Sequence, residues 1–275
     1  MERGLLRLAF TRTRNDKNSQ KRTAMPKLII ALDMPTKAQN LALCENLAQN
    51  LAPHNLSNLY LKIGLRSFIR DGVAFVRDLQ RLKFRIFLDL KLYDIPNTML
   101  DSLREIADLG VDLVTIHASC GRMAMQNIAD FARNTPNVPL IFAVTALTSF
   151  DEAGFSEIYN CDIEKSVANL AQISAECGID GIVCSPFECK FVKEKFNLLT
   201  LTPAIRPVRD DFGVDFALDL PNPKDDQNRA STLSFALNQK SDFLVIGRPI
   251  YTHQKPVELT RFILQKLQNH KNGDK

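Results

Sequence analysis

The stretch FLDLKLYDIPNT, residues 87–98, carries three charges directly after a run of apolar residues: Asp89, Lys91 and Asp94. Charges inside a buried strand are costly unless they are paired or lie at its open end. Alternation along a strand directs Asp89 and Lys91 to the same side, and Lys62 lies in the preceding strand pattern. We therefore expect an array of paired carboxylate and ammonium groups, which suits charge stabilisation and proton transfer.

A second group of residues points to phosphate binding. In VIGRPI, residues 245–250, Gly247 and Arg248 follow an apolar run. A glycine lets a ligand approach backbone N–H groups, and an arginine binds phosphate oxygens in a bidentate manner. Arg206 and Gln227 border a long polar stretch that precedes this run. These residues indicate a phosphorylated substrate covered by a lid.

The elements that must position these residues alternate along the chain. Short runs rich in Ile, Val, Leu and Phe are separated by longer stretches of helical period, such as residues 36–52 and 97–110. The predicted strands are residues 28–33, 59–64, 85–91, 112–119, 140–145, 181–185, 198–205 and 243–248. Eight strand–helix units in about 245 residues predict an α/β fold, a single-domain (β/α)8 TIM barrel. We assign residues 25–275 to this domain.

Polar residues gather at the predicted carboxyl ends of these strands, which is the face where barrel active sites form. They are Asp33, Lys62, Asp89, Lys91, His117, Thr145, Thr148, Ser185, Arg206, Gly247 and Arg248. We expect His117 to support the site through hydrogen bonds rather than to take part in the chemistry. The polar stretch after the seventh strand, residues 206–227, has no helical period and is the predicted lid.

Composition excludes several classes of function. The 275 residues are 45% hydrophobic and 24% charged, as in an ordinary soluble protein, and no apolar run approaches the roughly 20 residues that cross a membrane. The formal charge of +4 comes from residues 1–24, which hold seven lysines and arginines against two acidic residues. The rest of the chain sums to about −1, which does not favour nucleic-acid binding.

The basic segment at residues 1–24 allows three interpretations. It could be an import signal, an arm that binds nucleic acid, or an extension that arises from a wrongly assigned start codon. Its apolar part is too short and too charged for a secretory signal. Because Met25 and the first predicted strand follow at once, we expect an extension that is disordered or not native, and assign no function to it.

Metal and disulfide chemistry have little support. The six cysteines form no C-x-x-C pair, and we expect reduced thiols in a cytoplasmic protein. The four histidines form no i, i+4 pair, so no metal site is predicted. No glycine-rich nucleotide motif or nucleophile motif is present.

The sequence resembles the orotidine 5′-monophosphate decarboxylase family, in its bacterial type. FLDLKLYDIPNT matches the D-x-K-x-x-D-I-P-x-T signature of that family. The similarity continues in order through ALD at 31–33, LKIG at 61–64, IHAS at 116–119, VTALTS at 144–149, GIVCS at 181–185, LTPAIRP at 201–207, DDQ at 225–227 and VIGRPI at 245–250. One departure is Ala204, which stands where the family has a glycine.

The resemblance implies a role for each matching residue. Lys91 would protonate the carbon that loses carbon dioxide, and Asp89 would lie beside the departing carboxylate. Asp33 and Lys62 would bind the ribose hydroxyls, with Lys62 also bridging to Asp89. Thr148 and Ser185 would recognise the pyrimidine or support the loop over it, and the phosphate would be bound by Arg206, Gln227, Gly247 and Arg248.

The resemblance also implies a partner and a pathway. Asp94, Ile95 and Thr98 would reach into the site of a second subunit, so a homodimer with shared sites is expected. The reaction would convert orotidine 5′-monophosphate to uridine 5′-monophosphate, the last step of pyrimidine nucleotide synthesis. No cofactor and no metal would be required.

Two other functions stay open. One is a Mg²⁺-dependent sugar-phosphate decarboxylase or synthase of the same superfamily, which shares the D-x-K-x-x-D array. Such a site needs an acidic residue near the end of the second strand, where this chain has Lys62, whose ammonium would repel a cation. The other is a catalytically silent scaffold that binds nucleotide phosphates, against which the intact Asp89 and Lys91 argue.

Overall fold

The structure, a computed structural model, describes residues 25–56, 58–211 and 229–273 of the 275-residue chain. The predicted extension at residues 1–24, most of the predicted lid and Gln227 lie outside these ranges.

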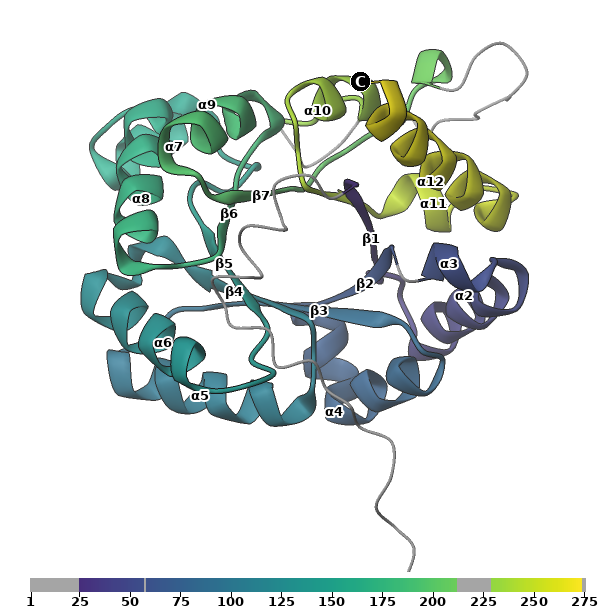
Figure 1. Cartoon of the computed structure of the whole chain (residues 1–275), viewed down its shortest axis with the longest axis horizontal. Coiled ribbons are helices and arrows are strands. Elements are labelled where there is room, and N and C mark those ends of the chain that lie inside the picture. Colours follow the sequence, from purple (N-terminus) through teal and green to yellow (C-terminus); the bar gives the residue numbers. More distant parts are fainter. Residues whose placement is uncertain (1–24, 57, 212–228, 274–275) are drawn as a thin grey trace, which may run out of the picture.

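The described residues form a closed barrel of eight parallel strands in sequence order, which confirms the predicted (β/α)8 fold (Figure 1). The strands are β1 (Lys27–Ala31), β2 (Leu59–Gly64), β3 (Arg85–Leu92), β4 (Leu113–His117), β5 (Leu140–Val144), β6 (Gly181–Val183), β7 (Leu199–Thr202) and β8 (Phe243–Ile246). Most strands end a few residues before their predicted ends, since the polar residues there belong to the loops. The site residues therefore lie just beyond the strands or in their carboxyl-terminal halves.

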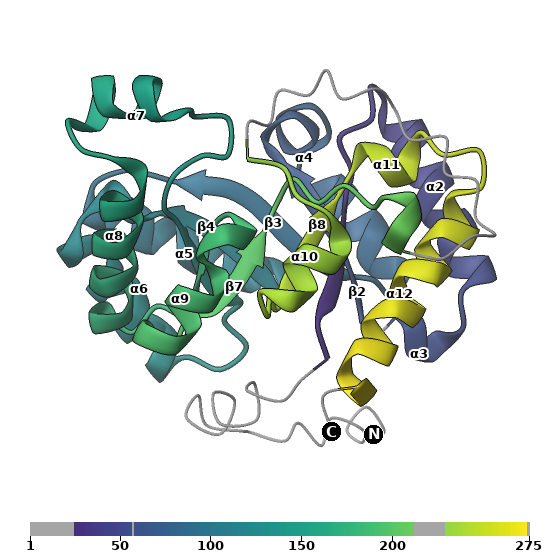
Figure 2. The same cartoon turned by 90° about the horizontal axis from the view of Figure 1, so that it is seen from above.

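Helices surround the strands on the outside, as both views of the molecule show (Figures 1 and 2). The described helices are α2 (Lys37–Asn50), α3 (Pro53–Leu56), α4 (Leu65–Arg81), α5 (Pro96–Leu109), α6 (Arg122–Asn134), α7 (Glu152–Tyr159), α8 (Ile163–Cys177), α9 (Pro186–Phe196), α10 (Leu233–Asn238), α11 (Arg248–Tyr251) and α12 (Pro256–Gly273), with short 3₁₀ turns η1 (Ala118–Cys120) and η2 (Arg209–Asp211). The two helices predicted by range are present as α2 and α5, and Gly110 ends α5 in the left-handed conformation.

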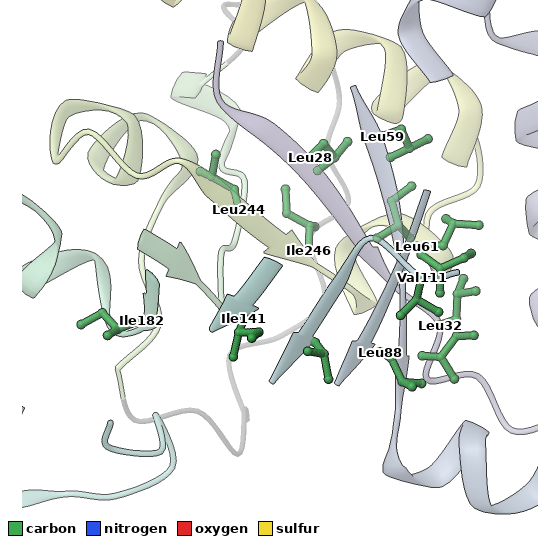
Figure 3. Close-up of a cluster of buried hydrophobic side chains, with 14 of the residues drawn as sticks. Leu28, Leu32, Leu59, Leu61, Leu88, Val111, Ile141, Ile182, Leu244 and Ile246 are labelled. Carbon is green, nitrogen blue, oxygen red and sulfur yellow. The ribbon is translucent and has the colours of Figure 1, made fainter. Parts of the chain in front are cut away.

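Two apolar layers follow from the alternation of side chains along the strands. On β1, Leu28 points outward into the layer between strands and helices, to which Leu61, Leu88 and Ile246 also belong (Figure 3). Ile30 is part of the same buried cluster. Their neighbours along the chain point into the barrel. This outer layer is the main contact between the strands and the helices that cover them.

The barrel interior is filled by the second apolar layer. It contains Ile29, Ala31, Tyr60, Phe87, Leu113, Phe142, Val144, Val183, Leu201, Phe243 and Val245. The Phe243 ring packs edge-to-face against both Tyr60 and Phe142, with ring centroids 5.7 and 5.3 Å apart. These rings close the lumen, so a ligand can enter only above them.

Three aspartates bind the strands together at the amino-terminal rim of the barrel. Asp112, Asp180 and Asp242 each stand directly before an even-numbered strand. Their Oδ2 atoms accept backbone N–H groups of Ile86, Ile141 and Thr200, at 2.8–2.9 Å. Their own carbonyl oxygens accept the N–H groups of Leu140, Leu199 and Lys27, on the following odd-numbered strands. Each aspartate therefore links two odd-numbered strands across the even-numbered strand between them.

Candidate active site

A cavity of about 490 Å³ opens at the carboxyl ends of the strands. Its floor is the upper part of the inner apolar layer, formed by Ala31, Phe87, Val144, Val183, Leu201 and Val245. Its polar lining is Asp33, Lys62, Asp89, Lys91, Thr148, Ser149, Arg206, Arg248 and Tyr251. An apolar floor with a charged wall suits a ligand that has one flat, weakly polar part and one anionic part.

The end of β3 has an unusual backbone that places Lys91. The register between β3 and β4 shifts between Leu88 and Leu92, and Lys91 has φ +50°, in the left-handed region. The hydroxyl of Thr115 on β4 accepts the Lys91 N–H at 3.0 Å and donates to Asp89 Oδ1 at 2.9 Å. Asp89 and Lys91 thus meet as predicted, but through this distortion rather than through regular strand alternation.

Four charged side chains form one row along the cavity wall. Lys91 Nζ lies 2.8 Å from Asp89 Oδ1, and Lys62 Nζ lies 3.6 Å from Asp89 Oδ2. Lys62 Nζ also lies 3.4 Å from Asp33 Oδ1. The row therefore alternates in sign, as predicted for Asp33, Lys62, Asp89 and Lys91.

The two central members of this row are nearly removed from water, with side chains only 12% exposed. Burial alone would raise the pKa of Asp89, but the ammonium groups of Lys62 and Lys91 outweigh it and lower that pKa. Burial would lower the pKa of Lys62, but the carboxylates of Asp89 and Asp33 outweigh it and raise that pKa. Each group therefore keeps its partner charged near neutral pH.

The described residues that were expected to bind phosphate follow β7 and β8. Gly247 precedes the short helix α11, and a Cβ added there would lie 3.2 Å from Ala31 Cβ, so the close approach of the two chain segments favours a glycine. Arg248 opens α11, and both Arg248 and Arg206 line the cavity. A short extra helix after the eighth strand is a frequent phosphate site in this fold. Gln227 lies outside the described residues.

Thr148 and Ser185 differ in their placement. Thr148 is buried and lines the cavity, and its carbonyl oxygen accepts the N–H of Arg229 at 3.3 Å. Ser185 is fully buried at the N-cap of α9 and does not line the cavity. Its hydroxyl accepts the Phe187 N–H, so it contributes to the shape of the turn after β6.

Asp94, Ile95 and Thr98 lie outside the cavity of their own chain. All three are exposed, and Ile95 is 66% exposed. Asp94 Oδ1 accepts the N–H of Ile95 at 2.7 Å. Beside them the exposed Tyr93 ring stacks on His117, whose pKa is lowered by burial and by Lys91. The structure therefore does not bring these three residues to the charged row of the same chain.

Three features of the site escaped the sequence analysis. Thr115 fixes both Asp89 and Lys91, and its only signal in the sequence is a hydroxyl within the buried run LVTIH. Tyr251 lines the cavity beside Arg248, and burial, followed by the charge of Asp33, raises its pKa. A largely buried ion pair joins Glu188 of α9 to Arg229, and neither residue lines the cavity.

Comparison with known proteins places the chain in a family. Residues 26–263 match the model of the "Orotidine 5'-phosphate decarboxylase / HUMPS family". The chain belongs to this family. Within it, a curated relative from Campylobacter jejuni named "Orotidine 5'-phosphate decarboxylase" is 46% identical over 88% of this chain and 100% of its own length.

A second curated relative and one solved structure agree with the family assignment. The Nautilia profundicola protein of the same name is 44% identical over 88% of this chain and 98% of its own length. The crystal structure of orotidine 5'-phosphate decarboxylase from Lactobacillus acidophilus aligns with a TM-score of 0.70 at 28% identity, covering 88% of this chain and 99% of that one. The family therefore extends over nearly the whole described barrel.

Two further properties concern only the described part of the chain. None of its helices is both long and apolar enough to cross a membrane. Within the same residues, no group of three or more His, Cys, Asp or Glu side chains is placed to hold a metal ion.

Proposed function

We propose that this chain converts orotidine 5′-monophosphate to uridine 5′-monophosphate, with Lys91 as the proton donor and without a metal or an organic cofactor. The decarboxylation itself, a step of pyrimidine biosynthesis, is supported by the family and by the names of the curated relatives. The finer mechanism is supported by the cavity. Its single most important feature is the ammonium of Lys91, held 2.8 Å from a buried carboxylate.

The chemistry requires a fixed positive charge beside one carbon. When the bond from C6 to the carboxylate breaks, carbon dioxide leaves and the electron pair remains on C6. The Lys91 ammonium stabilises that charge and transfers a proton to C6, and solvent then reprotonates the amine. Asp89 adds repulsion toward the substrate carboxylate, which is relieved as carbon dioxide departs.

The remaining cavity residues bind the rest of the nucleotide. Asp33 and Lys62 hydrogen-bond the ribose hydroxyls, Thr148 faces the pyrimidine, and Ser185 shapes the turn beneath it. The phosphate is bound by Arg206, Gln227, Gly247 and Arg248. Binding energy from the phosphate then orders the residues around the reacting carbon, although the phosphate takes no part in the chemistry.

Lys62 supports a mechanism without a metal ion. Its ammonium lies between Asp33 and Asp89, where a divalent cation would have to bind these same carboxylates. A cation there would meet repulsion from Lys62 and would compete with an ion pair that is already formed. The Mg²⁺-dependent sugar-phosphate reaction is therefore disfavoured.

The proposed homodimer is supported by the exposed residues Asp94, Ile95 and Thr98, which follow β3. Asp94, Ile95 and Thr98 follow the Asp89–Lys91 pair in one motif yet face away from their own cavity. We infer that they complete the site of a second copy. The catalytic domain comprises residues 25–275, and the six free thiols support a reducing, cytoplasmic location.

The test of the reaction follows the ultraviolet absorbance of orotidine 5′-monophosphate with purified protein, with and without EDTA. We expect turnover that EDTA does not change and that Lys91→Ala abolishes. Lys255→Ala is the matched control, because Lys255 forms an exposed ion pair with Glu258 and should retain full activity. Turnover lost on EDTA treatment, or retained in Lys91→Ala, would contradict the proposed mechanism. A folded protein that binds the nucleotide without turnover would be a silent scaffold.

Shared sites are tested by mixing two inactive variants, Asp94→Ala and Lys91→Ala. A mixed dimer contains one site with both defects and one site with none, so activity should return after subunit exchange. If labelled subunits exchange and no activity returns, Asp94 does not act in the site of a partner.

A further inference from the structure

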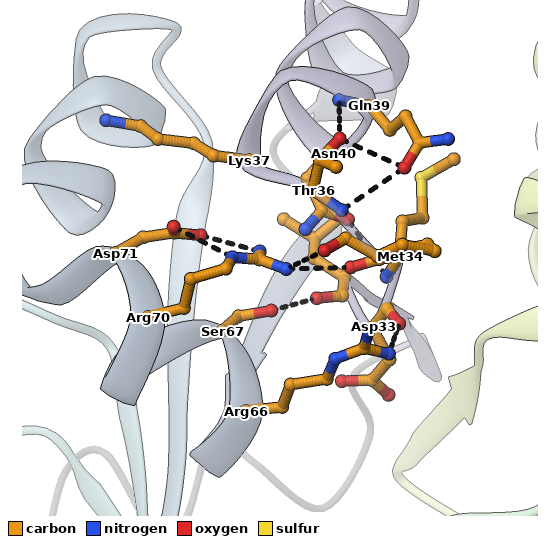
Figure 4. A network of polar contacts seen from close by, with 12 residues as sticks. Asp33, Met34, Thr36, Lys37, Gln39, Asn40, Arg66, Ser67, Arg70 and Asp71 are labelled. Carbon is orange, nitrogen blue, oxygen red and sulfur yellow. Dashed lines mark hydrogen bonds and ion pairs between the residues drawn. The ribbon is translucent and has the colours of Figure 1, made fainter.

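The loop that carries Asp33 is held by the helix that follows the next strand. In this loop, residues 32–35, four successive carbonyl oxygens accept hydrogen bonds from side chains of α4 (Figure 4). Ser67 Oγ donates to Leu32 O at 2.6 Å, and Arg66 Nη1 donates to Asp33 O at 3.4 Å. Arg70 Nη1 donates to Met34 O at 3.1 Å and to Pro35 O at 2.5 Å.

Arg70 is itself fixed on its other edge. Its Nε and Nη2 donate to the two carboxylate oxygens of Asp71, at 2.8 and 2.6 Å (Figure 4). The side chain of Asp71 is only 6% exposed, and that of Arg70 is 28% exposed. A guanidinium can bind both oxygens of a carboxylate through two nitrogens and two carbonyl oxygens through the third, a geometry that the single nitrogen of an ammonium cannot reproduce. The contact is therefore specific to arginine.

A backbone break separates this part of α4 from the rest of the helix. Gly72 has φ +59° and ψ −158°, so residues 65–71 form a short segment of their own. The segment begins directly after Gly64, two residues beyond Lys62, and it ends with Arg70 and Asp71. It therefore connects the end of β2, which carries Lys62, to the loop that carries Asp33.

Asp33 needs such support because its own side chain is weakly held. It is 43% exposed, and its contact with Lys62 Nζ is long, at 3.4 Å. The direction of the carboxylate is thus decided mainly by the backbone of the loop. From the other side, the buried Asn40 accepts the Met34 N–H at 3.4 Å. The Arg70 contacts are charge-assisted and, at 3.1 and 2.5 Å, shorter than the 3.4 Å contact of the Arg66 guanidinium.

We propose that Arg70 is a positioning residue, which holds the backbone of Met34 and Pro35 so that Asp33 meets the ribose hydroxyls of the substrate. This inference rests on the proposed function, in which Asp33 binds ribose. Arg70 does not line the cavity, so its effect on the substrate is transmitted through Asp33.

The first test compares steady-state kinetics of Arg70→Ala and Arg70→Lys with those of the wild type. We expect KM for orotidine 5′-monophosphate to rise about tenfold in Arg70→Ala, with kcat changed less than about threefold, because substrate binding is lost rather than proton transfer. Arg70→Lys should recover part of the loss, since it retains one hydrogen bond. Unchanged KM in Arg70→Ala would overturn the proposal.

The matched control is Arg77→Ala on the same helix. Arg77 Nη1 also donates to a backbone carbonyl oxygen, Leu109 O at 2.9 Å, but this oxygen lies on the last residue of α5 rather than beside Asp33. Its removal should leave KM unchanged. An equal rise in KM for both variants would mean that removing either arginine side chain from α4 disturbs the site. The specific role of Arg70 would then be rejected.

A double-mutant cycle tests whether Arg70 acts through Asp33. In an Asp33→Asn background, Arg70→Ala should raise KM by less than about twofold, because the group it positions is already impaired. A full tenfold effect in both backgrounds would show that Arg70 acts by another route. Hydrogen exchange of a peptide that spans residues 32–36 should increase in Arg70→Ala and not in Arg77→Ala, and an unchanged rate would reject the contact itself.

These readouts separate this inference from the proposed function. If the wild type is active and Arg70→Ala has an unchanged KM, only the positioning role of Arg70 is rejected. Absence of wild-type turnover rejects the proposed function and the ribose role with it, while the hydrogen-exchange result still decides whether Arg70 holds the loop.

Discussion

Thr115 offers a sharp test of how the charged row is built. Its hydroxyl makes two hydrogen bonds, one to the Asp89 carboxylate and one from the Lys91 N–H, and the residue is fully buried. Thr115→Val keeps the shape of the side chain and removes both. A hydrogen bond to a charged group contributes about 1.5–3 kcal/mol and a neutral one about 0.5–1.5 kcal/mol, so we expect a loss of roughly 2–4 kcal/mol in the free energy of unfolding.

The same substitution should impair turnover. The Lys91 N–H would lose its partner, and because this residue is held in a left-handed conformation, the backbone would relax toward an ordinary strand. A displacement of Lys91 Nζ by about 1 Å corresponds to a loss of about 100-fold in kcat. Because Lys91 is the proposed proton donor, kcat should fall much more than KM rises.

Two assays and two controls complete this experiment. Stability is measured by urea unfolding with circular dichroism, since the chain has no tryptophan, and turnover by the absorbance of the substrate. Thr115→Ser keeps the hydroxyl and should retain kcat within about threefold. Thr260→Val removes one buried hydroxyl, bonded to Pro256 O in α12, and should leave kcat unchanged. A folded Thr115→Val protein with wild-type kcat would refute this reasoning.

Three further predictions follow from buried or strained residues. Ala204 has φ +61°, which costs about 1–2 kcal/mol for an L-residue, so Ala204→Gly should raise stability by up to about 1 kcal/mol after the added unfolded-state entropy. Because the pKa of Asp89 is lowered in the folded state, its ionised form stabilises the fold above about pH 4, which is the pKa of an aspartate in the unfolded chain. This contribution is lost as the pH falls further. The difference in the free energy of unfolding between the wild type and Asp89→Asn should therefore shrink below about pH 4. Glu188→Gln leaves the buried Arg229 guanidinium without its counter-charge and should cost about 3–5 kcal/mol.

Each of these predictions has its own control or contrary outcome. Ala236→Gly, in the regular helix α10, should lower the melting temperature, and a fall in Ala204→Gly as well would show that residue 204 is not strained. A stability difference for Asp89→Asn that stays constant down to pH 2 would contradict the role of its ionised form. If Arg229→Met combined with Glu188→Gln is no more stable than Glu188→Gln alone, the unpaired cation is not the cause of the loss.

The fold could be predicted because most barrel strands are apolar on both faces, which distinguishes them from the helices around them. Strand ends were less certain, because a polar residue after an apolar run is compatible with the last strand position or with the loop. Ser185 shows this: it was predicted to end a strand, and it instead caps α9. Asp33 likewise lies two residues beyond β1.

The charged row could also be predicted, since Lys62, Asp89 and Lys91 are charges within otherwise buried strands. Thr115 could not, because threonine is common in strands for reasons of shape alone. The left-handed conformation of Lys91 gives no local signal either, as it depends on the register with β4. The Arg70 contacts depend on where two loops meet in the closed barrel, which the residues of α4 alone do not reveal.

Because of the aspartates at the amino-terminal rim, one end of the barrel holds the strands together while the other end carries the candidate active site. Asp112, Asp180 and Asp242 each bind main-chain N–H groups of two neighbouring strands there, so these links hold the strands whatever side chains the opposite loops carry. The link from Asp242 to Lys27 also joins the last strand to the first. Loops at the catalytic end can therefore be exchanged or lengthened during evolution, or cut to form new chain termini in a circular permutation. The aspartates at the other end keep the barrel closed in each case.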